Sequence, residues 1–412
     1  MKIPGNNRPR SASVSLSVVS IVVLQLYLAL SLRSDWNDSF SCSDGADRQA
    51  LPSLKSSPHW MFDVFHSGSL RNDFGGIHAR AFEVWKHGKL PCFPPDPKWF
   101  LPATHRIPAR EGLFLLKEMK TGGSTAAGIH LRIARNEARR QLGSPKHRFC
   151  KTRNDHPSAS TLKYAHRDRE NSFLWTVIRD PTQRAISQFF HFQVSREKVE
   201  PTDRNFQKWI QDEQDILHRY YLKTLSVDNI FNASLNPDFD PVATANKIMD
   251  DYDFMGLTER MEESAVVLQL LLGLKTGDIL YTNAKGSGGF DDGGYMDRGC
   301  IYIVPSFVSP GMKAYFRSPA WRVTSATDVF LHQAVNRSLD MTIDRLGRRR
   351  VEEALQRFRW ARQQVDNECS ANITYPCSAS GEYRKHRDCL WLDSGCGTTC
   401  MDQVAKNLRL YE

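Results

Sequence analysis

The sequence lacks the patterns typical of nucleic-acid-binding proteins. Its 412 residues contain no zinc-finger spacing, no RNP-like motif and no long run of Lys or Arg, which argues against nucleic acid as the main partner. The cysteines near the C-terminus include no CxxC pair, which disfavours a zinc site there. An internal repeat is also missing. The features that are present favour a globular protein with anionic partners.

Composition and charge describe a large globular body with a basic balance. Apolar residues make up 41% of the chain and charged residues of both signs 25%, which is enough to bury a large core. The net charge is +9 and the pI is near 9.1, which favours nucleotides, acidic glycans or membrane surfaces as partners. A generally basic, soluble surface is the alternative interpretation of the same charge.

The N-terminal segment predicts a membrane anchor. Three basic residues, Lys2, Arg8 and Arg10, precede a long apolar run, and about 20 such residues cross a bilayer as a helix. Because the positive flank stays cytoplasmic, we expect a cytoplasmic tail over 1–12, a single-pass type II signal anchor over 13–32 and a lumenal remainder. A cleaved signal peptide is the alternative, although its apolar core is usually shorter, at about 7–15 residues.

Residues 33–108 are predicted to form a lumenal stem, because they contain serines, aspartates and clustered prolines that resist regular structure. Four N-x-S/T sequons agree with a glycoprotein in the lumen, since such triplets are acceptors for N-glycosylation. The sequons lie at Asn37, Asn232, Asn336 and Asn372.

Nine cysteines are present, and residues 367–412 form a Cys-rich tail. In an oxidising lumen such cysteines form disulfide bonds, which would staple a loop-rich segment. The odd total leaves at least one thiol free or paired with another chain, and the pairing does not follow from the sequence. The tail cysteines are Cys369, Cys377, Cys389, Cys396 and Cys400.

The body of the chain, residues 109–366, contains three apolar runs that each precede a helical pattern. The runs are 112–116, 173–178 and 252–258, and such short runs are typical of buried strands in a parallel sheet. Strands that alternate with helices predict an α/β domain whose central parallel sheet is covered on both faces. Ligands of such sheets bind at the carboxyl ends of the strands, where the loops after the first two runs lie.

The helices after the first two runs have recognisable limits. A helical pattern with an apolar side spans about 126–141. The next helix is predicted to begin at Pro181, because Asp180 is a good N-cap and Pro is favourable at the first helical position. We expect it to extend to about Gln193.

Residues 117–125 (KEMKTGGST) join the first strand to its helix. A helix N-terminus offers unpaired N–H groups and a partial positive charge, so it suits a phosphate group. Gly122 and Gly123 let the backbone approach closely, and Lys120 supplies a full positive charge. The P-loop of a nucleoside triphosphatase has its Lys after the glycines, so this order argues against that class. An ordinary glycine turn before a helix is the alternative.

The loop after the second strand carries a second candidate anion site. Arg179 is at the strand end, and Ser187 lies about two turns into the next helix. The planar fork of Arg binds two oxygens of a phosphate group. Pairing of Arg179 with a carboxylate is the alternative.

Together, the two loops resemble the two PAPS-binding motifs of the Golgi carbohydrate sulfotransferases, where PAPS is 3′-phosphoadenosine 5′-phosphosulfate. The likeness is closest to the galactose-3-O- and heparan/uronyl 2-O-sulfotransferase groups, and it covers roughly Leu113 to Phe358, with gaps. The matching segments are 115–126 (LLKEMKTGGSTA), 177–189 (VIRDPTQRAISQF) and 252–272 (YDFMGLTERMEESAVVLQLLL).

The resemblance implies a role for each loop residue and for the chain as a whole. Lys120 would contact the oxygen that bridges sulfate and phosphate, and Arg179 and Ser187 would hold the 3′-phosphate. The fold would be a P-loop-like three-layer α/β domain behind the membrane helix and stem, in the Golgi membrane with its catalytic domain lumenal. The acceptor would be a glycan, possibly an acidic one, and no metal would be required. The 5′-phosphate would be held by Thr121, Gly122, Gly123, Ser124 and Thr125.

The acceptor hydroxyl needs a general base, because a sugar alcohol is a poor nucleophile until its proton is taken. His156 is the first candidate: in the related families a His precedes the second-strand Arg at a spacing close to that of His156 and Arg179. Asp155 is placed to orient it. His166 and Glu118 remain as alternatives.

Two other functions stay open on the sequence. An ATP-dependent lumenal glycan kinase would need a Mg²⁺-binding carboxylate at a strand end, for which Asp253 is the candidate. A non-catalytic lumenal glycan-binding protein would keep the fold without the activity.

Overall fold

The computed structural model describes residues 75–90, 110–143, 152–156, 158–230, 238–282, 288–292, 299–370, 377–383 and 398–412. Val64–Glu412 form one compact unit. The predicted tail and anchor, and most of the predicted stem, lie outside the described residues. Within the described part, every helix is too short or too polar to cross a bilayer.

A parallel sheet, four-stranded over the described residues, forms the centre of this unit, in the order β2-β1-β3-β4. The middle strands, β1 (Gly112–Leu116) and β3 (Ser172–Ile178), are buried along their whole length, as the apolar runs predict. β2 (Thr152–Asp155) and β4 (Phe254–Leu257) flank them. The third predicted strand is therefore confirmed in a shorter form.

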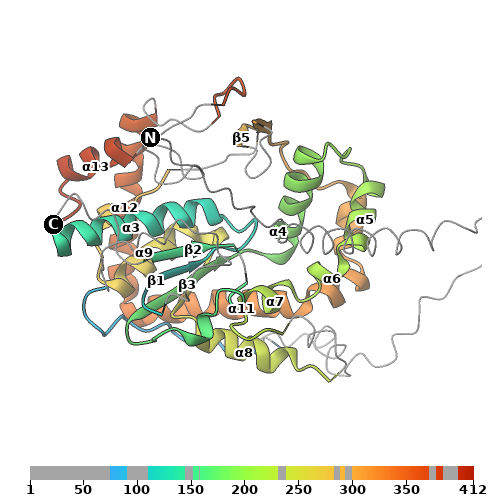
Figure 1. Ribbon diagram of the computed structural model, residues 1–412, viewed down its shortest axis with the longest axis horizontal. Coiled ribbons are helices and arrows are strands. Elements are labelled where there is room, and N and C mark those ends of the chain that lie inside the picture. Colours follow the sequence, from blue (N-terminus) through green and yellow to red (C-terminus); the bar gives the residue numbers. More distant parts are fainter. Residues whose placement is uncertain are drawn as a thin grey trace, which may run out of the picture. The chain divides into compact units, whose positions relative to one another are not determined.

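Helices cover both faces of the sheet (Figure 1). On one face, α3 (Gly123–Leu142) packs against β1 and β2. On the other lie α7 (Tyr220–Leu225), α8 (Pro241–Asp251) and the long α11 (Pro319–Leu346). α9 (Met261–Leu272) follows β4 and packs against it. The predicted α/β class with a central parallel sheet is thus confirmed.

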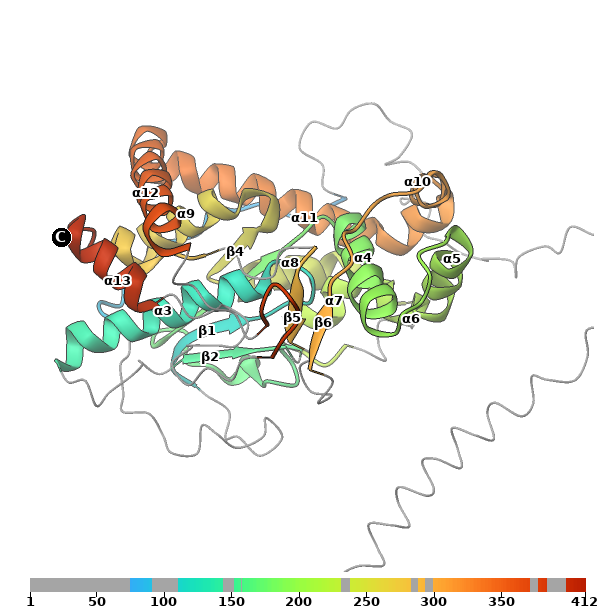
Figure 2. The same cartoon turned by 90° about the horizontal axis from the view of Figure 1, so that it is seen from above.

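A second apolar cluster packs several helices beside the sheet, on the side of α4 in Figure 2. Aromatic rings fill it in edge-to-face contact, as where the centroids of Phe189 and Phe206 lie 5.3 Å apart. The helices are α4 (Pro181–Gln188), the π-helical segment η4 (Phe189–Arg196), α5 (Asp203–Asp212), α6 (Gln214–Leu217) and α10 (Pro310–Phe316). The helix predicted from Pro181 to about Gln193 is thus α4 continued by η4, whose hydrogen-bonding pattern changes after Gln188.

Several helices begin with the same two-residue signal, a capping Asp or Ser followed by Pro at the first helical position. At α4, an oxygen of the Asp180 carboxylate accepts the N–H of Gln183 at 2.9 Å, as predicted from the sequence. The signal therefore fixes where α4 starts, directly after β3. The pairs are Asp180–Pro181 of α4, Asp240–Pro241 of α8, Ser309–Pro310 of α10 and Ser318–Pro319 of α11.

The C-terminal helices pack into the same core. α12 (Arg348–Cys369) lies against α9, and α13 (Thr398–Asn407) lies against α12. A disulfide bond joins Cys369, at the end of α12, to Cys400 in α13. The tail cysteines are therefore used in part as predicted, and the bond holds α13 in place. The short 3₁₀ turns named within the described residues are η3 (Tyr164–His166), η6 (Thr258–Arg260) and η7 (Thr276–Asp278).

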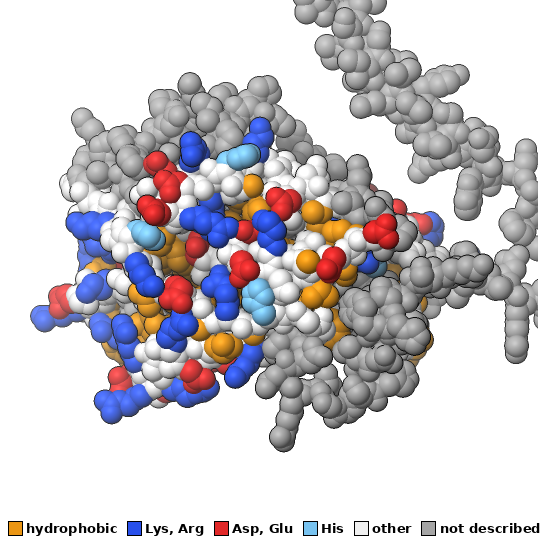
Figure 3. Space-filling model, turned by 90° about the horizontal axis from the view of Figure 1, so that it is seen from below, with side chains coloured by type: hydrophobic (Ala, Val, Ile, Leu, Met, Phe, Trp, Pro, Cys, Tyr) orange, Lys and Arg blue, Asp and Glu red, His pale blue; other side chains and the backbone are white. Residues whose placement is uncertain are grey.

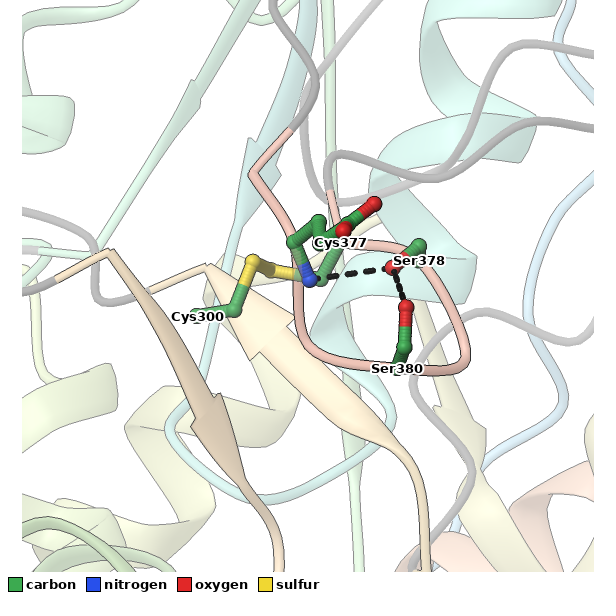
Figure 4. Close-up of a disulfide and its surroundings, with 5 residues drawn as sticks. Cys300, Cys377, Ser378 and Ser380 are labelled. Atoms are coloured by element: carbon green, nitrogen blue, oxygen red, sulfur yellow. Dashed lines mark hydrogen bonds between the residues drawn. A yellow bond between two sulfur atoms is a disulfide. The ribbon is translucent and has the colours of Figure 1, made fainter.

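A second disulfide bond connects the Cys-rich tail to the body of the chain. It joins Cys377 to Cys300 in β6 (Cys300–Tyr302), which pairs antiparallel with β5 (Phe290–Asp292). Figure 4 shows this bond beside a turn in which Ser378 Oγ and Ser380 Oγ lie 2.8 Å apart. The disulfides therefore tie tail to body as well as tail to tail, which the spacing of the cysteines does not reveal. Cys42, Cys92, Cys150, Cys389 and Cys396 lie outside the described residues.

The structure bears on two interpretations made from the sequence, that of the net charge and that of the sequon at Asn336. On the face drawn in Figure 3, Lys and Arg side chains are interspersed with Asp and Glu. Asn336 lies inside α11, and its amide oxygen accepts a hydrogen bond from Arg260 Nη1 at 2.8 Å, a setting that does not favour glycosylation. Asn37, Asn232 and Asn372 lie outside the described residues.

Replacing both Cys369 and Cys400 by Ser should lower the free energy of unfolding by about 3–4 kcal/mol, because the bond closes a separation of 31 residues and so restricts the unfolded chain. Urea unfolding under oxidising conditions measures the loss. Replacing Cys300 and Cys377, which are 77 residues apart, should cost more. An unchanged urea midpoint in the Cys369/Cys400 variant would contradict the bond.

Candidate functional site

The carboxyl ends of three neighbouring strands bring the predicted site residues to one edge of the sheet. Leu116, the last residue of β1, pairs with Asp155 of β2 and with Thr176 of β3. His156, residues 117–122 (the first loop) and Arg179 therefore follow strands that end side by side. The chain leaves β1 for the α3 face, and the connection after β3 includes α8 on the opposite face (Figure 1). Ligands of open α/β sheets bind at such a switch point.

The first loop has an unusual backbone. Lys120 has a φ of 64° and Gly122, the N-cap of α3, a φ of 75°. The left-handed region is uncommon for a residue with a side chain, and such strain gathers at binding and catalytic sites. A Cβ at Gly122 would lie 2.9 Å from Met261 Cε, so the Met261 side chain would have to shift, and the positive φ would strain the new residue as well. Lys120 is thus held in a defined, strained turn at a helix N-terminus.

The loop residues differ in which groups they can offer to an anion. The Thr121 side chain is fully buried, and its hydroxyl donates to the Glu118 carbonyl at 3.2 Å. Any contribution of Thr121 to phosphate binding would therefore come from its backbone N–H. Ser124 and Thr125 lie half-buried in the first turn of α3, where N–H groups point away from the helix.

Arg179 and Lys120 are in direct contact. Arg179 Nη1 donates a long hydrogen bond, 3.4 Å, to the backbone carbonyl of Lys120. The guanidinium of the second loop therefore faces the first loop instead of turning away from it. Ser187 is half-buried in the last turn of α4.

Residues that follow β4 form hydrogen bonds with both loops. The Thr258 hydroxyl lies 2.7 Å from the Thr121 carbonyl and 3.1 Å from the Ile178 carbonyl. The Glu259 carboxylate accepts the Asp180 N–H at 2.8 Å and lies 3.4 Å from His332 Nε2. The end of β4 thus fixes the first loop to the end of β3.

Helix α7 contacts both loops and so connects them. The Tyr221 hydroxyl donates to the Arg179 carbonyl at 2.6 Å and accepts the Arg179 N–H at 3.0 Å. One turn of the same helix carries Tyr220 and Thr224, whose hydroxyls both hydrogen-bond the Glu118 carboxyl of the first loop. Because one helix grips Glu118 and Arg179 at once, the spacing between the loops depends on α7.

A buried charge network lies under the loops. The Arg184 guanidinium stacks 3.5 Å above the ring of Tyr220 and donates to Gln188 Oε1 at 2.8 Å. Burial raises the pKa of Glu118 to about 7, although the hydrogen bonds and Arg184 act against it. Burial likewise raises the pKa of Asp328, which accepts the Tyr221 N–H, to about 7. The Arg184 guanidinium acts on both carboxyls, and Asp328 also interacts with Arg219 and Lys223.

The three candidate general bases lie in different places relative to the first loop. His156 is exposed and follows the end of β2, next to the first loop. Glu118 is only 4% exposed and bonded to α7, so it faces the interior. His166 is exposed in η3, which lies between β2 and the start of β3.

Asp253 lies at the wrong edge of the sheet for a magnesium ligand beside the loops. It precedes β4, and its carboxylate accepts the Leu174 N–H at 2.7 Å and pairs with Arg167 Nη1 at 3.0 Å. Leu174 is near the amino end of β3, opposite the loops. Asp253 is therefore at a strand end, as expected, but it enters β4 instead of leaving it and so lies away from the two loops.

Sequence reasoning missed the residues that position the loops. Tyr221 lies in a segment that carries no recognisable motif, and its partner Arg179 is 42 residues away in the chain. Arg184 falls within the matched segment 177–189, but no feature of the sequence assigns it a role. Thr258 and Glu259 fall within the third matched segment, directly after its strand, and that place was the available signal. No family model matches this chain, and no curated protein matches it.

Replacing Tyr221 by Phe should lower the free energy of unfolding by about 1–3 kcal/mol, because the buried N–H and carbonyl of Arg179 lose their partner. Amide hydrogen exchange at Arg179 should speed up as well. Tyr281→Phe is a matched control, since it removes a hydroxyl bonded to Arg362 elsewhere. Unchanged exchange at Arg179 in the Tyr221 variant would contradict the connection.

The pH dependence of stability should report the buried carboxyls. The folded protein keeps protons on Glu118 and Asp328 up to about pH 7, whereas the unfolded chain releases them near pH 4. The free energy of unfolding should therefore fall as the pH rises from about 5 to 7, by up to about 1.4 kcal/mol per pH unit for each group. Urea unfolding at a series of pH values measures this slope.

Glu118→Gln should flatten that slope, because the amide fills the same space and does not ionise. The exposed Glu353→Gln on α12 is the control and should leave the slope unchanged. A Glu118→Gln variant with the slope of the wild type would show that this carboxyl does not keep its proton.

Proposed function

We propose that this chain is a PAPS-dependent sulfotransferase that moves a sulfuryl group to a hydroxyl of a glycan in the Golgi lumen. The contact between Arg179 and the Lys120 carbonyl carries the proposal. It joins two anion-binding loops at the switch point of a parallel sheet, and the same two loops carry the sulfotransferase-like motifs. The proposal includes a P-loop-like three-layer fold and a lumenal location behind an N-terminal anchor.

The donor would bind across the two loops. The N-terminal turn of α3, from Gly122 to Thr125, and the side chain of Lys120 would receive the 5′-phosphosulfate. Arg179, with Ser187, would hold the 3′-phosphate, the group that distinguishes PAPS from ATP. Tyr221 and Glu259 would set the position of Arg179 by gripping its backbone and that of Asp180.

The reaction would be an in-line displacement at sulfur. His156 takes the proton of the acceptor hydroxyl as its oxygen attacks the sulfur atom. The bond from sulfur to the bridging oxygen breaks, and its electron pair leaves with adenosine 3′,5′-bisphosphate. Lys120 and the N–H groups of the loop stabilise the charge that grows on this oxygen, so most of the rate gain comes from positioning and preorganised charge. None of these steps calls for a metal ion.

The alternative kinase hypothesis depended on the Asp253 carboxylate as a ligand of Mg²⁺, and this carboxylate lies away from the two loops. Asp253 lies at the amino end of β4 and is paired with Arg167. Glu259, which does lie at the edge with the loops, is engaged by the Asp180 N–H and His332. Donor competition separates the two hypotheses: adenosine 3′,5′-bisphosphate should displace PAPS, and ATP should not.

The full-length chain, kept in mild detergent, should transfer ³⁵S from labelled PAPS to members of a glycan panel. Lys120→Ala should lower kcat by about 10²–10³-fold, because a charge that acts on the leaving group is removed. Arg179→Ala should weaken binding of adenosine 3′,5′-bisphosphate while leaving that of AMP unchanged. Lys208→Ala, on the exposed side of α5, is the control.

The base is tested by a pair of histidine variants. His156→Ala should lower kcat by about 10²-fold or more and leave bisphosphate binding intact, whereas His166→Ala should keep the activity. The reverse result would transfer the role to His166. A folded protein that binds the bisphosphate but labels no glycan would instead support a non-catalytic glycan-binding protein.

A further inference from the structure

A hollow with basic walls lies at the end of α3 remote from the first loop. Figure 2 shows α13 beside the C-terminal part of α3. The hollow is lined by residues of these two helices. Its volume of about 360 Å³ falls within the range of roughly 300–1,000 Å³ found for small-molecule sites. It is lined by Arg135 and Arg139 of α3 and by Thr399, Asp402, Gln403 and Lys406 of α13.

Positive charge exceeds negative charge in this hollow. The Asp402 carboxylate binds three guanidinium groups, with distances of 3.0 Å to Arg132 Nη2, 2.7 Å to Arg135 Nη2 and 2.9 Å to Arg139 Nη1. Lys406 follows Asp402 by one helical turn. Asp402 is the one carboxylate among the lining residues, which include three cationic groups, those of Arg135, Arg139 and Lys406. Arg132, which is not among the lining residues, also pairs with Asp402.

Two N–H donors of this cluster have no hydrogen-bond partner among the described residues. They are Arg132 Nη1 and Arg135 Nε, and both are buried. The whole side chain of Arg132 is only 1% exposed. Asp278, the next carboxylate, does not serve these donors, because it accepts from Arg140 and Asn136. Buried donors in native proteins are nearly always satisfied by protein, water or ligand. Arg135 lines the hollow, so its Nε is available to an acceptor added there, whereas Arg132 is not among the lining residues.

The remaining lining groups also suit an anion. Burial, together with Arg132 and Arg139, lowers the pKa of Arg135 to about 10 in spite of Asp402, so a further negative charge would be stabilising. Thr399 lies in the first turn of α13, where the helix end favours anions, and Gln403 adds an amide donor.

We propose that this hollow binds a tetrahedral oxyanion, the sulfate or phosphate group of an ion or an ester. The guanidinium forks match such oxygens in pairs, and Lys406 closes the open side as a mobile point charge. Arg135 and Arg139 lie about 18–24 Å along α3 from Gly123, so the hollow shares no group with the two loops. The site therefore stands whether or not the chain transfers sulfate.

Isothermal titration of sodium sulfate into the full-length chain in detergent, at constant ionic strength, tests the site. The double variant Arg139→Ala/Lys406→Ala should lose at least tenfold in sulfate affinity, since two charge-assisted contacts disappear. Arg349→Ala/Arg350→Ala removes the same charge from the exposed face of α12 and should bind sulfate like the wild type. Lys120→Ala should also bind normally, which separates the hollow from the proposed donor site.

Gln403→Glu provides a second test that does not weaken the fold. It places a carboxylate inside the hollow, so sulfate binding should disappear, while the midpoint of thermal unfolding without sulfate should rise. The proposal is overturned if the wild type does not bind sulfate, or if the Arg139/Lys406 and Gln403 variants both bind it as tightly as the wild type.

The source of the oxyanion is separated by comparing inorganic sulfate with a heparin-derived octasaccharide and its desulfated form. A sulfated octasaccharide that binds at least tenfold more tightly than inorganic sulfate, with the gain lost in Arg139→Ala/Lys406→Ala, identifies an ester carried by a glycan. Equal affinity identifies the free ion. If the desulfated octasaccharide binds as tightly as the sulfated one, the hollow recognises carboxylates or sugar and the oxyanion proposal fails.

Discussion

The parallel pairing of β1 with β3 is the constraint on which the candidate site depends. Parallel strands end at the same edge of a sheet, and here Leu116 lies opposite Thr176. The loop with Lys120 and the loop with Arg179 therefore emerge side by side, although 59 residues of chain separate them. Because the two connections lead toward opposite faces, this edge is the kind of switch point at which open α/β sheets bind their ligands.

The pairing places the loops, and a polar network beneath them sets their spacing. Tyr221 holds Arg179 through its backbone, and Tyr220 and Thr224 hold Glu118, all from one short helix. Such a network is costly to bury, since Arg184 and two carboxyls leave water. An apolar layer would have been cheaper, but it would not have fixed two flexible loops relative to each other. The network therefore lowers the stability of the fold but fixes the positions of the two loops relative to each other.

Helix α3 carries positive potential at both ends for different reasons. At its N-terminus the unpaired N–H groups and the strained turn at Lys120 create the potential. Near its C-terminus the potential comes from arginine side chains that gather on the single carboxylate of Asp402. The second site depends on α13, which the disulfide between Cys369 and Cys400 holds against α12.

The sequence by itself determined the main strands and helices and the types of residue that follow the strands. The apolar runs at 112–116 and 173–178 and the Asp180–Pro181 signal are local features, so they predict strands and a helix start correctly. The glycines after β1 and the arginine after β3 are local in the same sense. Which end of its strand Asp253 occupies depends on where β4 starts, and the apolar run over 252–258 did not define that start.

Only the tertiary structure decided which distant groups meet. Several contacts join residues that no spacing rule connects. They are the contacts of Tyr221 with Arg179, of Thr258 with Thr121, of Cys300 with Cys377 and of the α3 arginines with Asp402. These contacts arise because packing the helices on a twisted sheet brings their side chains together, and that packing depends on the whole core. Periodicity and capping act within a few residues, so they reveal the elements and leave such contacts unspecified.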